Sequence, residues 1–313
     1  MDALLEIADT YVLDTIYNQL ALLIAPVALP QDDSSLSNVT AATNSLFSTG
    51  AWQTRSYIPR QILSLSILML LGAHILYFLF ASFSYYFIFS HKMMHHPRFL
   101  PNQISLEIKT SLKAFPLMML LTLPWFLAEV RGWSKLYNNV SDHWGGWWYL
   151  VGSVAAFLLF TDYCIYWIHR WLHHPLLYKP LHKLHHRWII PTPFASYAFH
   201  PVDGYLQSVP YHLFVFLVPM HRYLYLGLFF AVNFWTILIH DSDMITGHPL
   251  ENIINGPAHH TLHHIYFTVN YGQYFTWADR AGQSYRHPDT SLDPLLEVKM
   301  HSESLKEGKA KPE

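Results

Sequence analysis

The sequence predicts an all-α membrane protein: a bundle of about four transmembrane helices, the last one or two folded as a hairpin, under a cytosolic histidine-rich helical cap. Of its 313 residues, 52% are hydrophobic and only 13% are charged, whereas soluble domains carry about 25% charged residues. Several uncharged runs are long enough to cross a bilayer. Histidine, at 22 residues, outnumbers lysine and arginine together, at 19. The net charge of −2 gives no electrostatic support for a nucleic-acid partner.

The order of segments along the chain suggests four regions. Residues 1–60 form a lumenal or interfacial N-terminal region, and residues 61–168 hold transmembrane helices. Residues 169–289 form a catalytic histidine-box domain that includes a membrane hairpin at 205–239, and residues 290–313 are a cytosolic tail. The N-terminus is acidic, so we expect no cleaved signal peptide. The lone cysteine, Cys164, excludes an internal disulfide framework and cysteine-based metal sites.

Three apolar runs predict membrane spans. Ser64–Phe89 has no charged residue and exceeds the roughly 20 residues that a bilayer requires. Phe115–Val130 is shorter and contains two prolines. Trp147–Ile168 has tryptophan near both ends, as expected at membrane interfaces. An earlier apolar piece, Leu20–Leu29, is too short to span and is expected in the interface.

A fourth apolar region, 205–239, is interrupted by the tetrapeptide Pro219–Arg222. A single crossing would place Arg222 in mid-bilayer at a cost of about 2.5–3.5 kcal/mol. A single crossing would also put His200 and His240 on opposite sides of the membrane. Two short arms folded as a hairpin avoid both consequences, so we predict a hairpin whose tip lies at the far interface.

Charge sets the expected orientation. Loop 90–114 carries four lysines or arginines against one glutamate, which places it in the cytosol by the positive-inside rule. Residues 1–60 and 131–146 are then lumenal, and everything after Ile168 is cytosolic. The sequons at Asn38 and Asn139 fall on the lumenal side. Lys309 and Lys311 form a dilysine pattern near the C-terminus, which predicts the endoplasmic reticulum membrane. The alternative is that they belong to a solvated basic tail.

Three histidine clusters of similar spacing follow the third span. The first reads H-x-x-x-H-H and the other two read H-x-x-H-H. Their members are His169, His173 and His174; His182, His185 and His186; and His260, His263 and His264. Residues three and four apart share a helix face, so pairs can reach one metal ion, and the number of imidazoles favours two ions over one. Imidazole suits zinc, copper, iron and nickel.

Two other classes of protein remain open at this point. A histidine-rich metal transporter or buffer usually carries its histidines in polar, low-complexity loops, whereas these lie in aromatic-rich helical patterns. A zinc hydrolase would act without oxygen. The remaining histidines of the chain are interpreted as surface or core residues.

Asp162 lies inside the third span, seven residues before His169 and on the same helix face. An intramembrane acid is a candidate functional residue. We expect Asp162 to accept the distal N–H of a ligand histidine and so orient it. The alternative is that Asp162 is the partner of a buried tyrosine or of a backbone group.

Residues Thr161 to Asp289 resemble the sterol C-5 desaturase family of the fatty acid hydroxylase and sterol desaturase superfamily. The resemblance rests on TDYCIYWIHRWLHH, LHKLHHRW, PTPFASYAFHPVDGYLQSVPYH, NFWTILIHDSD and HHTLHHIYFTVNYGQYFTWADRAGQSYRHP. The histidine boxes point to the superfamily, and FHPVDGYLQS with YGQYFTWADR and SYRHP points to the C-5 desaturase branch. The resemblance implies a di-iron site and oxygen-dependent formation of a C5–C6 double bond in a Δ7-sterol. Electrons would come from NAD(P)H through a reductase and cytochrome b5.

Matched residue by residue, the resemblance implies ten ligands: His169, His173, His174, His182, His185, His186, His240, His260, His263 and His264. His200 also matches the family and is expected in a supporting catalytic role. We predict that Phe194, Tyr197 and Phe199 line or flank the sterol path. Zinc can replace iron in such a site in purified protein. Rival reactions within the superfamily are C-4 methyl oxidation, fatty acyl hydroxylation and terpenoid desaturation.

Overall fold

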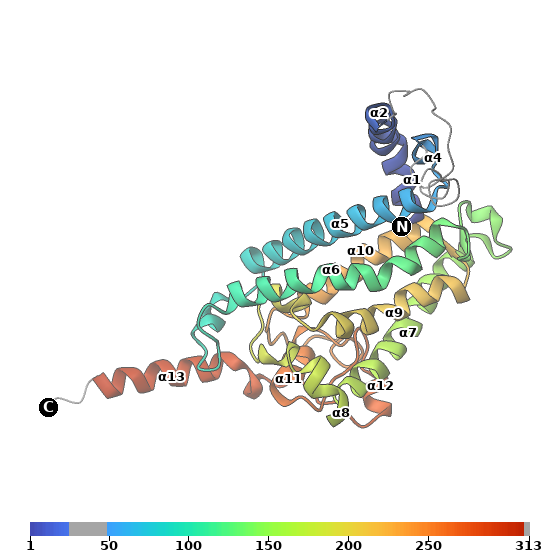
Figure 1. Cartoon of the computed structure of the whole chain (residues 1–313). Helices are drawn as coiled ribbons and strands as arrows, with labels where there is room; N and C mark the ends of the chain where they lie inside the picture. Colours follow the sequence, from blue (N-terminus) through green and yellow to red (C-terminus); the bar gives the residue numbers. More distant parts are fainter. Residues whose placement is uncertain (25–48, 310–313) are drawn as a thin grey trace.

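The structure is a computed structural model that describes residues 1–24 and 49–309 (Figure 1). Its framework is five helices: α5 (Ile58–Phe87), α6 (Gln103–Val130), α7 (Gly146–Leu172), α9 (Pro201–Leu217) and α10 (Arg222–Leu238). Three of them, α5, α6 and α7, are long and apolar enough to cross a membrane, and α10 is a shorter apolar helix. The prediction of an all-α membrane protein is confirmed. Asn38, Lys311 and part of the Leu20–Leu29 piece lie outside the described residues.

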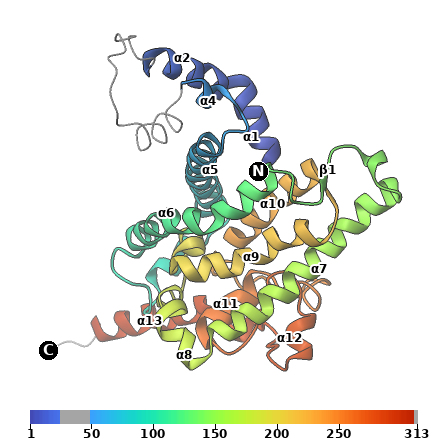
Figure 2. The same ribbon diagram turned by 45° about the vertical axis from the view of Figure 1, so that its right-hand side comes forward.

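The shorter elements gather at the two ends of this framework (Figures 1 and 2). Helices α1 (Asp2–Ala8), α2 (Asp14–Ile24) and α4 (Thr49–Gln53) lie at the end where α5 begins. Helices α8 (Pro175–Leu177), α11 (Pro257–Tyr266) and α12 (Trp277–Ala281) lie at the other end. With the segments that join them, residues 173–200 and 239–293 form what we call the cap. Helix α13 (Pro294–Lys309) extends away from it.

Five short helical turns complete the chain between these helices. They are Asp9–Leu13, His91–His95, Val140–Asp142, Pro193–Tyr197 and Thr290–Leu292. Two more, Tyr178–His182 and His185–Arg187, carry the second histidine cluster. That cluster therefore lies on two short turns and not on one regular α-helix.

The structure forms the helical hairpin, and its place in the membrane stays a prediction. Helices α9 and α10 fold back on each other, and the tip strand β2 (Met220–His221) pairs in parallel with β1 (Leu136–Tyr137). The tip thus lies beside loop 131–146, at the end opposite the cap. His200 directly precedes α9 and His240 follows α10, so both lie at the cap end.

Helix α6 corrects one expectation. The sequence predicts residues 103–114 as part of a loop spanning 90–114, but α6 already begins at Gln103. The reason is a buried polar face: Gln103, Glu107 and Ser111 recur every four residues and are at most 1% exposed. Glu107 accepts hydrogen bonds from Gln103 Nε2 at 2.7 Å and from the Thr192 amide at 3.3 Å. A hydropathy average misses this helical turn because its buried residues are polar.

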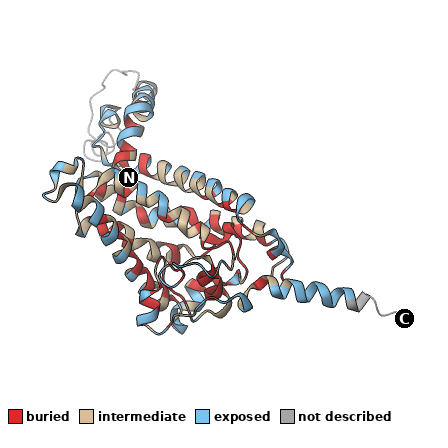
Figure 3. Cartoon of the chain, turned by 180° about the vertical axis from the view of Figure 1, so that it is seen from behind, coloured by how far each residue is buried: buried red, intermediate tan, exposed pale blue. Residues whose placement is uncertain are grey.

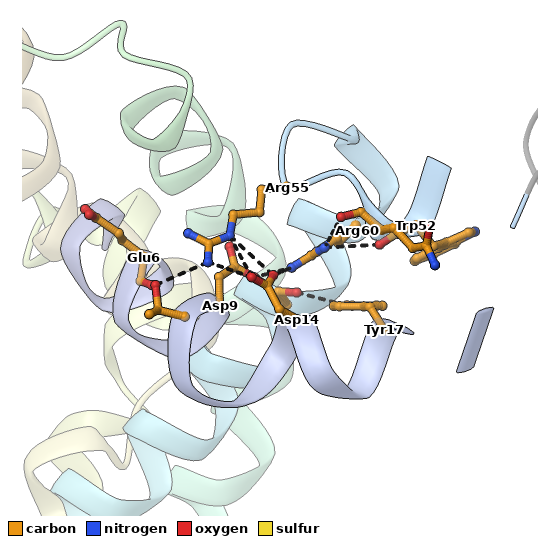
Figure 4. Close-up of polar contacts among 10 residues, drawn as sticks. Glu6, Asp9, Asp14, Tyr17, Trp52, Arg55 and Arg60 are labelled. Atoms are coloured by element: carbon orange, nitrogen blue, oxygen red, sulfur yellow. Dashed lines mark hydrogen bonds and ion pairs between the residues drawn. The ribbon is translucent and has the colours of Figure 1, made fainter. Parts of the chain in front are cut away.

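Ion pairs of the buried Arg60 connect the N-terminal helices to the start of α5 (Figure 4). Arg60 is 2% exposed and donates to Asp9 at 2.7 Å and to Asp14 at 2.5 Å. Arg222, at the hairpin tip, pairs with Glu6 at 2.5 Å. Arg222 therefore lies at the end of the bundle and not in its middle, as the hairpin requires.

Buried residues line the inside of the bundle, and exposed ones lie on its outer surface (Figure 3). One buried cluster joins α7, α9 and α10 through Phe157, Phe214 and Val232. The outer face of α5 instead exposes Leu71, Ile75 and Leu79 at 56–62%, one helical turn apart. A continuous exposed apolar stripe of this kind is expected against lipid.

Candidate metal centre

Four segments bring the histidines together in the cap. The last turn of α7 carries His169, and His173 follows it as the C-terminal cap residue. The turns between Tyr178 and Arg187 carry the second cluster, and α11 carries the third. His240 enters from the end of α10. All of these except His173, which is half-buried, are at most 6% exposed.

These side chains form two groups, each able to hold one ion. The first contains His169, His173, His182, His186 and His263, and the second contains His185, His240, His260 and His264. Within each group one ring nitrogen from every residue lies within 4.8 Å of the others. The groups adjoin, since the ring centroids of His186 and His264 are 5.0 Å apart.

The spacing within each cluster sorts its members between the two groups. His182 and His186, four residues apart, share the first group, and His260 and His264 share the second. In each cluster the middle histidine belongs to the other group. His185 belongs to the second group, and His263 belongs to the first. The H-x-x-H-H pattern thus contributes to both groups from a single turn.

Hydrogen bonds fix the tautomer of several rings. The Nδ1 atoms of His169, His240, His263 and His264 lie 2.6–3.0 Å from backbone carbonyl oxygens. His182 Nδ1 lies 2.8 Å from Asp203 Oδ2. Because these oxygens only accept hydrogen bonds, each Nδ1 carries the proton, and in the neutral ring Nε2 then presents a lone pair.

Those lone pairs converge. Within the groups, neighbouring Nε2 atoms are 3.0–3.3 Å apart. In the pair His169–His182, at 3.2 Å, both Nδ1 atoms are committed to acceptors, so neither neutral ring can donate to the other. Two nitrogens bound at about 2.1 Å to one ion would be roughly 3.0–3.4 Å apart at right-angle to tetrahedral geometry. The donor set therefore fits a metal ion in each group.

The electrostatics of the cap keep these rings neutral. Burial, reinforced by the surrounding imidazoles, holds the pKa of His263 and of His264 well below the usual range of histidine. Neutral imidazole is the form that binds metal. Near neutral pH these rings are thus in the form that binds metal cations.

Two of the predicted histidines lie outside both groups. His174 is exposed, and its Nδ1 accepts from the Leu176 amide at 3.4 Å as the N-cap of α8. Helix α7 ends at Leu172, so the chain turns and directs His174 away from both groups. His200 similarly caps α9, accepting from the Val202 amide at 3.3 Å. The structure therefore places His174 outside both candidate groups and His200 at a helix end.

Asp162 also differs from its main expectation. Its Oδ1 accepts from the amides of Gln273, Tyr274 and Phe275 at 2.7–3.2 Å, which is the backbone alternative. The carboxylate that contacts a ligand histidine is Asp203, which is fully buried. Sequence reasoning missed it because an acid in the first turn of a helix is ordinarily read as a helix-end charge. Its one signal was a position three residues after His200 in HPVD.

Asp162 is connected to the first group of histidines through a loop. The amides of residues 271 and 272 donate to Asp279 at 2.8 Å, so two buried carboxylates hold five consecutive N–H groups. The Tyr271 carbonyl, in this loop, receives His169 Nδ1. A rigid loop therefore sets the orientation of a first-group ring.

The predicted substrate residues lie at different distances from this centre. Phe199 contacts the His185 ring at a centroid distance of 5.9 Å, and Tyr197 contacts Phe199 at 6.0 Å. Gly204 lets the Phe199 ring approach α9, because a Cβ there would lie 2.0 Å from Phe199 Cε2. Phe194 lies farther out, against Tyr77 and Tyr85.

Comparison with known proteins agrees with this geometry. The fatty acid hydroxylase family model matches residues 154–284, which contain all nine grouped histidines. The chain is 51% identical over 304 residues to the Delta(7)-sterol 5(6)-desaturase ERG3B of Gibberella zeae, covering 95% of this chain and 93% of that protein. It is 55% identical over 233 residues to lathosterol oxidase of Mus musculus, covering 74% and 78% respectively. No solved structure matches the chain.

Fold and site thus define a multi-pass membrane protein with a histidine-rich centre of the fatty acid hydroxylase class. Within that class, the chain belongs to the sterol C-5 desaturase family, whose fungal members match it over most of its length.

Proposed function

We propose that this protein introduces the C5–C6 double bond into a Δ7-sterol, with oxygen as the oxidant, at a di-iron centre held by nine histidines. The observation that carries the proposal is the pair of adjoining all-histidine groups with converging Nε2 lone pairs. The relatives named as sterol desaturases support the substrate class. Two bound iron ions would supply the oxygen activation that an unactivated C–H bond requires and that no side chain provides.

The reaction balances with an external reductant. Two hydrogens leave the sterol, and two electrons and two protons from outside complete the reduction of one oxygen molecule to two waters. The electrons are proposed to come from NAD(P)H through a reductase and cytochrome b5. Zinc in the same ligands would be inert, because zinc does not change its oxidation state.

The chain's own residues position the reactants. Asp203 and the loop carbonyls hold the imidazoles in a fixed orientation. Phe199 and Tyr197 offer an aromatic wall beside His185, against which the flat ring system of a sterol can pack. On the other side, Tyr178 and Phe267 cover His186 at centroid distances of 6.0 and 4.8 Å, which keeps water from the centre. We propose that the cap and C-terminus face the cytosol at the endoplasmic reticulum membrane.

The proposal is tested by sterol profiling in a yeast that lacks its own C-5 desaturase. The host would express the wild type, His263→Ala, or His174→Ala as a matched histidine outside both groups. We expect Δ5,7-sterols with the wild type and with His174→Ala, and only Δ7-sterols with His263→Ala. Persistence of Δ7-sterols with abundant wild-type protein would overturn the assignment, and any other oxidised lipid would then identify a rival reaction of the superfamily.

A further inference from the structure

The exposed charges of the cap up to Arg286 have one sign, and an exposed acid, Asp289, follows near its end. Between Tyr163 and Arg286, a range that the structure describes in full, the four exposed charged residues are Lys179, Lys183, Arg187 and Arg280. The acids of this range are Asp203, Asp241, Glu251 and Asp279, which are buried, and Asp243, which is half-buried. Within this range the acidic side chains thus lie inside the protein, and a partner that approached residues 179–187 would meet a cationic surface.

Three of the four exposed cations lie on the segment that carries the second histidine cluster. Lys179, Lys183 and Arg187 recur every fourth residue and point outward, while His182, His185 and His186 between them are at most 4% exposed. Lys183 and Arg187 each directly follow a histidine of the first group. This surface therefore lies over the metal centre with a single layer of chain between them.

An aromatic ring connects that layer to the centre. Tyr178, next to Lys179, is half-buried, and its ring lies 5.6–6.4 Å from those of His173, His182 and His186. Three apolar side chains are exposed in the same segment, Leu176 at 77%, Leu177 at 38% and Leu184 at 37%. Apolar contacts with charged residues around them are typical of specific protein interfaces.

We propose that Lys179, Lys183 and Arg187, with Leu176 and Leu184, form the docking surface for an acidic electron-transfer protein. This inference rests on the proposed function, whose balance needs two electrons from outside the chain. Opposite charges would steer the donor to the surface, and docking there would bring its redox centre next to the histidine layer. An anionic lipid headgroup matches the charge equally well but supplies no electrons, so the observations favour a protein.

The test measures donor binding and sterol turnover separately. The protein would be placed in nanodiscs of neutral lipid, with cytochrome b5 as the donor probe together with its reductase and NADPH. The main variant combines Lys179→Glu, Lys183→Glu and Arg187→Glu. A neutral variant replaces the same three residues with Gln, and Arg280→Glu is the matched control, because Arg280 is exposed on the same cap over the Tyr285 ring.

We expect the charge-reversed variant to raise the Kd for the donor, measured by surface plasmon resonance, at least tenfold with unchanged metal content. The neutral variant should show a smaller rise and a weaker dependence on salt, and Arg280→Glu should stay within twofold of the wild type. A Kd within twofold for the charge-reversed variant would overturn the docking surface. The same Kd would also be measured in nanodiscs that contain anionic lipid. A rise in Kd that occurs only there would likewise overturn the proposal, because it would assign the surface to the membrane. Absence of sterol turnover by the wild type with bound donor would instead count against the proposed function.

Discussion

The contact between Asp203 and His182 predicts how strongly one buried carboxylate supports the metal centre. Asp203 accepts from His182 Nδ1 and from Gln207 Nε2, both at 2.8 Å, and Asp203 and His182 are fully buried. In Asp203→Asn the side chain keeps its shape but retains one acceptor oxygen. One of the two donors must then lose its partner, and the negative charge that fixes the His182 tautomer disappears.

Two estimates of the cost agree. A buried donor without a partner costs about 1–3 kcal/mol. Loss of a carboxylate that orients a metal-bound histidine typically lowers metal affinity or activity about 10–100-fold, which corresponds to about 1.4–2.8 kcal/mol. We therefore expect Asp203→Asn to weaken metal retention about 10–100-fold.

The assay is competition for the metal by a chelator of known affinity, with sterol turnover measured on the same samples. The matched control is Glu107→Gln, since Glu107 is equally buried and hydrogen-bonded but contacts no histidine. Glu107→Gln should lower the melting temperature without changing metal affinity. Equal metal affinity in Asp203→Asn and the wild type would refute the orienting role.

Three further predictions follow from the same contacts. Asp162→Asn removes the charge that holds three loop amides, so it should lower both the melting temperature and the metal content; unchanged metal would show that the loop does not orient His169. Gly204→Ala places a Cβ against Phe199 and should cost about 1–3 kcal/mol of stability in chemical denaturation, with reduced turnover but normal metal content; normal turnover would separate Phe199 from the sterol path. His173→Ala should lose metal and activity while His174→Ala keeps both, and equal losses would restore His174 as a ligand.

The sequence predicted the elements better than their contacts. The hairpin followed from the cost of one arginine in lipid, and eight of the nine grouped histidines followed from the local spacing of the three clusters. The ninth, His240, was predicted only from the family resemblance. His174 shares that spacing, yet the end of α7 at Leu172 turns it away. Where a helix ends depends on the proline and the turn that follow it, which the histidine pattern does not contain.

The two aspartates illustrate what the sequence lacks. Asp162 lies on the same helix face as His169, and this made it the natural candidate to orient that ring. The structure instead packs loop 271–275 against Asp162 and brings Asp203 of α9 to His182. Such pairings join residues that are 21 to 113 positions apart, so they are set by tertiary packing and leave no periodic trace.

The most direct test of the whole account is the number of iron ions per chain in a sample that desaturates a Δ7-sterol. The wild type, reconstituted with ferrous iron and purified, would be analysed by mass spectrometry for metal content and for sterol product. The account predicts two irons per chain, with loss of metal and product in both His263→Ala, from the first group, and His260→Ala, from the second. Full desaturation by a sample with one iron or none, or by both variants, would contradict it.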